Sequence, residues 1–151
     1  DATKSGRLIQ SFLINDLSNW YVRLCRRRFW KNDYGPEKIS AFQTLHECLV
    51  VVSQLMSPIA PFYSDLLYRD LFFKNKKGSK SVHLSPFPVF KKDDVDVGLK
   101  TKMNLVQSIV SLGLSLRKKL NIRVRQPLSG VSIIKNKHSE FALNEDLLGL
   151  N

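Results

Sequence analysis

Apolar side chains recur at intervals of three or four residues along most of the chain, and this pattern predicts a largely helical protein. The first such stripe predicts a helix from about Thr3 to Arg27. Its expected buried residues are Ile9, Leu13, Leu17, Trp20 and Leu24. Glycine and proline then interrupt the pattern at residues 32–36, so we expect a turn there.

A second periodic segment predicts a helix that begins at Pro36, where a missing N–H costs no hydrogen bond, and ends at Pro58. Its main stripe consists of Ile39, Phe42, Leu45, Leu49, Val52 and Met56. Further apolar residues widen this stripe until the helix is apolar nearly all round its middle. We therefore expect this helix to lie in the centre of a bundle.

A third helix is predicted to begin at Pro61, after a short corner that starts at Ser57. Its expected buried residues are Tyr63, Leu66, Leu67, Leu71 and Phe73. Residues 74–80 are hydrophilic and predict a loop, and prolines limit residues 81–88 to an extended connection.

A fourth helix is predicted by the stripe Leu105, Ile109, Leu112, Leu116 and Leu120. The aspartates that precede it suit the positive end of its dipole, and Asn121 suits its C-terminal end. Residues 122–129 then alternate apolar and polar side chains, so we expect Arg123 and Arg125 to point the same way from an extended segment. A short strand at 131–134 and a short helix at 140–148 would follow.

These elements predict an all-α fold: a helical bundle of four main helices with a small extended element near the C-terminus. We expect residues 1–129 to form the bundle and residues 130–151 to form a short extension from it. Because the first residue is Asp1 rather than Met, we interpret the chain as a piece of a longer protein.

The charge of the chain narrows the choice of partner. A net charge of +11 on 151 residues indicates a polyanion: RNA, DNA or an anionic membrane. Residues 97–139 contain no acidic residue, although they include nine lysines and arginines. The longest apolar run, Leu49–Val52, is far shorter than the ~20 residues that a membrane span needs.

The residues that most often carry catalysis or bind metals give weak signals here. Cys25 and Cys48 lie among apolar neighbours in predicted helices, which favours two buried free thiols in a reducing compartment. The aspartates at 93, 94 and 96 lack the glycine and terminal glutamate of a calcium loop, so we expect no metal site. His83 has no nucleophile or acid near it in sequence, and we interpret it as a packed or capping residue.

A basic and aromatic stretch ends the first predicted helix and is the main candidate for function. Arg23, Arg26, Arg27 and Arg28 lie away from the apolar stripe, and Phe29 and Trp30 follow them. Cations for phosphates and flat rings for unstacked bases are what single-stranded RNA requires of a protein surface. The alternative interpretation is a solvated basic face whose aromatic residues pack inside the bundle.

The stretch from Asp16 to Trp30, Asp-Leu-Ser-Asn-Trp-Tyr followed by arginines and Phe-Trp, resembles the start of the anticodon-binding helical domain of isoleucyl-tRNA synthetases. Residues 57–62, Ser-Pro-Ile-Ala-Pro-Phe, resemble a corner found in the synthetases for isoleucine, valine and leucine. Two further segments resemble the isoleucine enzymes in the same order: Ser-Val-His-Leu at residues 81–84, and residues 116–129.

This resemblance implies a domain that grips the anticodon stem and loop of the isoleucine tRNA. The residues that it implies for RNA binding are Arg23, Arg26, Arg27, Arg28, Trp30, Arg117, Lys118, Lys119, Arg123 and Arg125. Phe29 is a weaker candidate for stacking on a base, and Trp20 is expected in the core. The alternative is a structural or docking module of the same synthetase, or of a valine or leucine enzyme, that makes no contact with RNA.

The catalytic motifs of the family, His-Ile-Gly-His and Lys-Met-Ser-Lys-Ser, do not occur in the chain, so we expect no catalytic residue and no cofactor in it. The resemblance implies that the parent enzyme is an isoleucine–tRNA ligase that uses ATP and Mg²⁺ through other domains. It also implies a cytoplasmic location. The expected partners are the tRNA and the catalytic and C-terminal domains of the parent, and the chain itself is expected to be a monomer.

Overall fold

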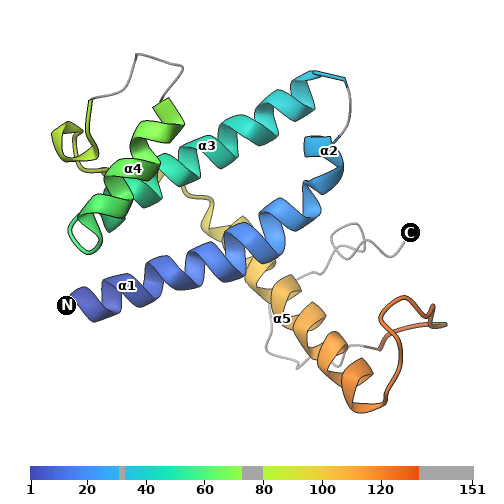
Figure 1. Cartoon of the computed structure of the whole chain (residues 1–151). Coiled ribbons are helices and arrows are strands. Elements are labelled where there is room, and N and C mark those ends of the chain that lie inside the picture. The colour runs from blue at the N-terminus through green and yellow to red at the C-terminus, as the bar shows by residue number, and fades with distance from the viewer. Residues whose placement is uncertain (31–32, 73–79, 133–151) are drawn as a thin grey trace. The chain divides into compact units, whose positions relative to one another are not determined.

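The computed structural model describes residues 1–30, 33–72 and 80–132, and every regular element in these ranges is a helix (Figure 1). The chain divides into two compact units, the first comprising Asp1–Phe90 and the second beginning at Lys91. The described residues contain no strand, which confirms the prediction of an all-α fold.

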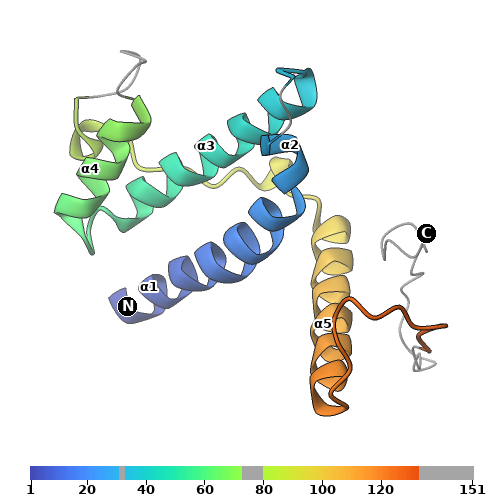
Figure 2. The same cartoon turned by 45° about the vertical axis from the view of Figure 1, so that its right-hand side comes forward.

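The first predicted helix is present, but its middle has a different hydrogen-bond register. It consists of α1 (Ala2–Ser11), the π-helix η1 (Phe12–Val22) and, after a turn at Cys25, the short helix α2 (Arg26–Trp30). Figure 2 shows the ribbon that runs from α1 to α2. The Asp1 carboxylate caps α1 by accepting the N–H groups of the third and fourth residues at 3.0 and 3.3 Å. A π-helix bonds each N–H five residues back, so it winds more residues into each turn than an α-helix.

This wider winding changes which residues face the rest of the unit. From the π-helix onward, Leu13, Leu17, Tyr21, Cys25 and Phe29 are buried or half-buried at intervals of four, and Asp16 and Trp20 beside this row are half-buried too. Leu24, which the α-helical spacing predicted to be buried, is 66% exposed, and that prediction was wrong. Tyr21 takes its place, and its hydroxyl donates to the Ala41 carbonyl at 2.9 Å.

Helix α3 (Pro36–Met56) is the central element of the first unit, because α1, α2, α4 and η2 all contact it. Its bounds and its central position agree with the prediction. Its most deeply buried residues are Ala41, Val52 and Ser53, whereas Ile39 and Phe42 near its start remain about half exposed.

Helix α4 (Pro61–Phe72) begins at the predicted proline but turns a different face to α3. Ser64 and Tyr68 are buried, whereas Tyr63 and Leu66, which we expected to be buried, are 60% and 54% exposed. A helix meets a close neighbour through its small residues, and Ser53 of α3 and Ser64 of α4 are both fully buried. The hydrophobic pattern alone does not show that preference.

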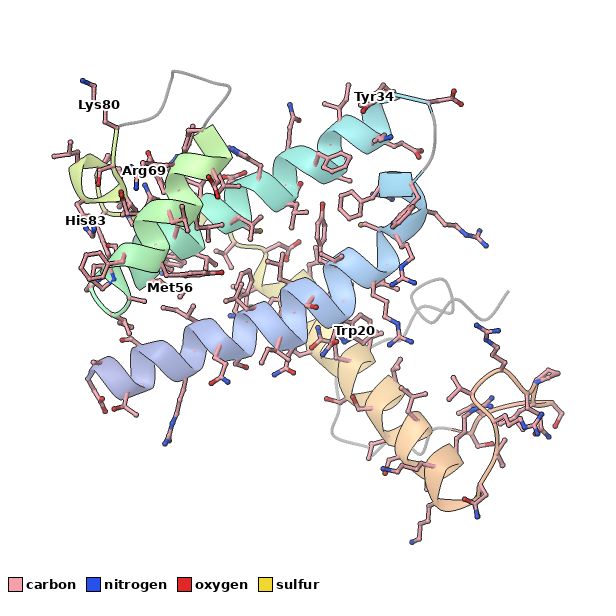
Figure 3. All side chains as sticks on the ribbon, viewed as in Figure 1. Trp20, Tyr34, Met56, Arg69, Lys80 and His83 are labelled. Carbon is pink, nitrogen blue, oxygen red and sulfur yellow. The ribbon has the colours of Figure 1, made fainter. Side chains whose placement is uncertain are left out.

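The connection after α4 is fastened to it through Asp65. The carboxylate of this residue accepts the Ser81 hydroxyl at 2.6 Å and the Val82 N–H at 3.1 Å, and it pairs with Arg69 at 3.1 Å. Figure 3 shows Arg69 on α4 beside the segment that carries His83. The short 3₁₀-helix η2 (Val82–Leu84) is thereby held against α4, with Val82 buried.

The second unit contains the 3₁₀-helix η3 (Lys92–Asp94) and the long helix α5 (Val97–Lys119). Asp96 caps α5 by accepting the Leu99 N–H at 2.9 Å, as the aspartates before it predicted. Val106 is buried. Three leucines of the predicted apolar stripe near the C-terminal end of the helix, Leu112, Leu116 and Leu120, are exposed.

Three predictions concern the ends of the chain or its relation to a membrane. Within the described ranges, no helix is long and apolar enough to cross a membrane. The strand expected at 131–134 and the helix expected at 140–148 lie wholly or mostly outside the described residues. The domain boundary expected at residues 129/130 stays a prediction.

Candidate nucleic-acid interface

The arginines in and just before α2 are exposed and have no acidic partner among the described residues. Arg23, Arg26, Arg27 and Arg28 are all exposed to solvent, and within the described part of the chain none of them forms an ion pair. The turn at Cys25 starts α2, because the carbonyl of Cys25 accepts the N–H groups of Arg28 and Phe29 at 2.9 and 3.1 Å. Four unneutralised guanidinium groups therefore lie within six residues of one another.

The two aromatic residues at the end of α2 have opposite environments. Phe29 is half-buried and packs edge-to-face against Phe42, with ring centroids 4.9 Å apart, and against Tyr21 at 6.4 Å. Its ring anchors α2 to α3 and is not available to stack on a base. Trp30, the next residue, is 80% exposed. Trp20 is half-buried, which agrees with its expected place in the core.

A second exposed ring follows, which the basic and aromatic pattern of the sequence did not predict. Tyr34 is 80% exposed at the N-terminal end of α3 (Figure 3). The Lys38 ammonium lies over its ring, 4.2 Å from the centroid. Hollows of about 380 and 230 Å³ border this pair, and Arg28 lines the smaller one. An aromatic residue in a Gly-Pro turn four residues before a lysine was the only signal that the sequence offered.

The remaining candidate residues surround the C-terminal end of α5. Asn121 adopts a left-handed conformation (φ 54°) and donates to the Lys118 carbonyl at 3.2 Å, while Ile122 donates to the Arg117 carbonyl at 2.8 Å. These two bonds form a Schellman motif, which ends the helix where the sequence predicted. Asparagine tolerates the left-handed region better than most residues do.

The residues beyond this motif do not form the extended segment that we expected. The Gln126 N–H donates to the Arg123 carbonyl at 3.0 Å, which closes a turn. Nη1 of Arg117 donates to the carbonyls of Arg123 at 2.8 Å, Val124 at 3.4 Å and Gln126 at 2.9 Å. The backbone therefore turns around the Arg117 guanidinium group. The short apolar and polar alternation at residues 122–129 does not predict this turn.

The exposure of the basic residues at this end of α5 differs. Lys118, Lys119, Arg123 and Arg125 are exposed, whereas Arg117 is half-buried under the turn. The structure thus gathers the ten predicted residues into two groups, residues 23–30 in the first unit and residues 117–125 in the second.

Groups that could support other chemistry are structural or isolated. The described residues contain no cluster of three or more histidines, cysteines or carboxylates that could hold a metal ion. The Ser81 hydroxyl that donates to Asp65 lowers the pKa of that carboxyl. Because the partners of Asp65 are Ser81, the Val82 N–H and Arg69, we interpret Asp65 as a structural residue. The His83 side chain is exposed and its backbone N–H donates to Ser81, so it belongs to the cap of η2.

An open apolar groove of about 480 Å³ lies between α1 and α3. Cys48 is among its lining residues as a free thiol, and burial raises its pKa. Cys25 is also a free thiol, so the two cysteines form no disulfide, as expected.

Comparison with known proteins supports an interface for RNA. Residues 3–133 match the family described as the anticodon-binding domain of tRNA ligase. Three similar proteins, each named isoleucine–tRNA ligase, come from Cytophaga hutchinsonii (52% identical over 134 residues), Porphyromonas gingivalis (49% over 133 residues) and Deinococcus radiodurans (44% over 133 residues). Each alignment covers 88% of this chain but only 11–12% of the relative, so the chain spans about an eighth of their length.

Proposed function

Because this chain belongs to the anticodon-binding domain family of tRNA ligases, we propose that it binds the anticodon stem and loop of the isoleucine tRNA. The single observation that carries this proposal is the cluster of Arg23, Arg26, Arg27 and Arg28, which form no ion pair within the described residues, beside an exposed tryptophan. Guanidinium groups attract phosphates, and an indole ring without packing partners can stack on an unpaired base. The three relatives described above are each named isoleucine–tRNA ligase, which favours that tRNA over those for valine or leucine.

We divide the interface by chemistry. Arg23, Arg26, Arg27 and Arg28 contact the phosphates, while Trp30 stacks on a base of the loop. Tyr34 and Lys38, which follow in the turn and at the start of α3, extend the same surface. In the second unit, Lys118, Lys119, Arg123 and Arg125 supply further phosphate contacts.

The parent protein that we propose is an isoleucine–tRNA ligase acting in the cytoplasm. Its ATP and Mg²⁺ are held by parts of the protein other than these residues, because the chain lacks the ATP-binding motifs of the family and the described residues offer no metal cluster. This domain, as a monomer beside the catalytic and C-terminal domains, holds the tRNA in position while aminoacylation takes place elsewhere. The alternative, a docking module without RNA contact, is less well supported, since the matching family binds anticodons.

Binding of an anticodon stem-loop transcript at a series of salt concentrations tests the proposal. With these eight phosphate contacts, the affinity should fall by roughly three to four decades between 50 and 200 mM salt. The double variant Arg26→Gln/Arg27→Gln should weaken binding and reduce the slope of log affinity against log salt by about 1.4–1.8.

The matched control is Lys4→Gln/Arg7→Gln, which removes two exposed charges from α1 of the same unit. It should leave the salt slope within about 0.3 of the unmodified chain, because phosphates that it does not contact release no counterions. Equal losses in both double variants would reduce the interaction to net charge alone and contradict the proposed site.

A further inference from the structure

One residue holds the turn after α5 through both its backbone and its side chain. The Arg117 carbonyl accepts the Ile122 N–H at 2.8 Å, and its Nη1 donates to the carbonyls of Arg123, Val124 and Gln126. Three carbonyl oxygens therefore converge on a single nitrogen. Without that nitrogen, the three oxygens would lose the donor that they share, although the Arg123 oxygen would keep the Gln126 N–H.

The environment of Arg117 also differs from that of its basic neighbours. Nη1 carries two hydrogens, and three backbone acceptors already share them. The side chain is half-buried, whereas Lys118 and Arg123 are exposed. One of the three nitrogens of the Arg117 guanidinium group, Nη1, is thus committed to the protein's own backbone, which fixes the orientation of the group.

The turn needs such a fastening because its charges repel one another. Four further cations, at positions 118, 119, 123 and 125, lie on this short segment, and residues 97–139 include no acidic residue to pair with them. Like charges favour an open chain, and an open chain would have to be ordered again when it binds. A guanidinium group bound to carbonyls and placed at the negative end of α5 opposes this opening from within.

We propose that Arg117 is a positioning residue, which fixes the turn at residues 120–126 so that Arg123 and Arg125 are presented to RNA phosphates, and that it is not itself a phosphate ligand. This inference rests on the proposed function of the chain. It also revises the role that the sequence assigned to Arg117, which was placed among the ligands.

The test compares Arg117→Met with Lys118→Met, its neighbour in the last turn of α5, in the full 151-residue chain. Both variants lose one charge and keep an unbranched side chain, but only the first releases the turn. Hydrogen exchange at the Gln126 amide, which donates to Arg123, should accelerate in Arg117→Met and stay unchanged in Lys118→Met. Circular dichroism checks that both variants stay helical.

Binding of the anticodon stem-loop at 100 mM salt gives the functional result. Arg117→Met should weaken binding by about tenfold to a hundredfold, the loss expected for two phosphate contacts, because it misplaces Arg123 and Arg125 together. When Arg117→Met is added to a chain that already carries Arg123→Gln and Arg125→Gln, it should weaken binding by less than about a further twofold. An equal loss in both backgrounds, with Gln126 exchange unchanged, would identify Arg117 as a ligand and overturn the inference.

Arg117→Lys separates charge from reach, since the lysine ammonium ends one bond short of the position of Nη1. We expect it to behave like Arg117→Met in both measurements, and binding at the level of the unmodified chain would overturn the positioning role. Failure of the unmodified chain to bind at 50 mM salt would overturn the proposed function and the inference together. Binding by that chain, with additive losses in the variants, would overturn only the inference.

Discussion

Replacing Phe29 or Trp30 by alanine separates the structural role of α2 from its proposed role in binding. The Phe29 ring makes edge-to-face contacts with Tyr21 and Phe42, each worth about 0.5–1.5 kcal/mol. Half-burial of its side chain contributes about 1 kcal/mol more. Phe29→Ala should therefore lower the free energy of unfolding by about 2–4 kcal/mol. A five-residue helix is too short to persist without such an anchor.

Trp30→Ala is the matched variant, since its ring is 80% exposed one position further along the chain. Its free energy of unfolding should stay within about 0.5 kcal/mol of the unmodified chain. Its affinity for the stem-loop should fall by about 1–3 kcal/mol through the loss of stacking. Urea unfolding followed by circular dichroism gives the first quantity and a binding titration the second. Equal losses of stability in the two variants would refute the assignment of one ring to the fold and the other to RNA.

Four further substitutions test the packing of the first unit and the contacts of Asp65. Ser64→Ala should leave the free energy of unfolding unchanged or raise it by about 1 kcal/mol, because the Ser64 hydroxyl is buried without a partner in the described residues. Ser53→Ala should lower it by about 0.5–1.5 kcal/mol, because the Ser53 hydroxyl donates to the Val50 carbonyl at 2.7 Å. Urea unfolding of both variants measures these changes. Val52→Ala should cost roughly 2–3 kcal/mol in the same assay, since its side chain is 3% exposed. The pKa of Asp65 lies below the ordinary value of about 3.9, chiefly because Ser81 donates to it, so its contribution to stability is present above that value and is lost as the pH falls through the folded pKa. Unfolding measured from pH 5 to pH 2 should therefore depend less on pH in Asp65→Asn than in the unmodified chain.

The helix boundaries could be predicted because each depends on local chemistry. Pro36 and Pro61 begin α3 and α4, and Asp96 caps α5, in agreement with the preferences of those residue types. Asn121 ends α5 for the same kind of reason, since few residues tolerate its left-handed conformation. The central position of α3 also followed from the sequence, because a helix that is apolar nearly all round must be surrounded.

The errors arise where tertiary contacts override periodicity. The register of a π-helix cannot be read from apolar spacing, so Leu24 was assigned to the core in place of Tyr21. Ser64 was overlooked because a small polar residue carries no hydrophobic signal, although its size suits a close helix contact. Arg117 was grouped with exposed cations because its acceptors are backbone carbonyls, which leave no trace in a sequence.

The π-helix between Phe12 and Val22 also sets the phase of the binding residues around the helix axis. Deleting a single residue from this segment would turn the residues after it around the helix axis, because each residue of an α-helix adds a rotation of about 100°. The arginines of α2 would then be turned away from their present direction, while the composition and net charge of the chain stayed almost the same. The length of this segment, to the single residue, is thus as much a determinant of the interface as the basic residues themselves.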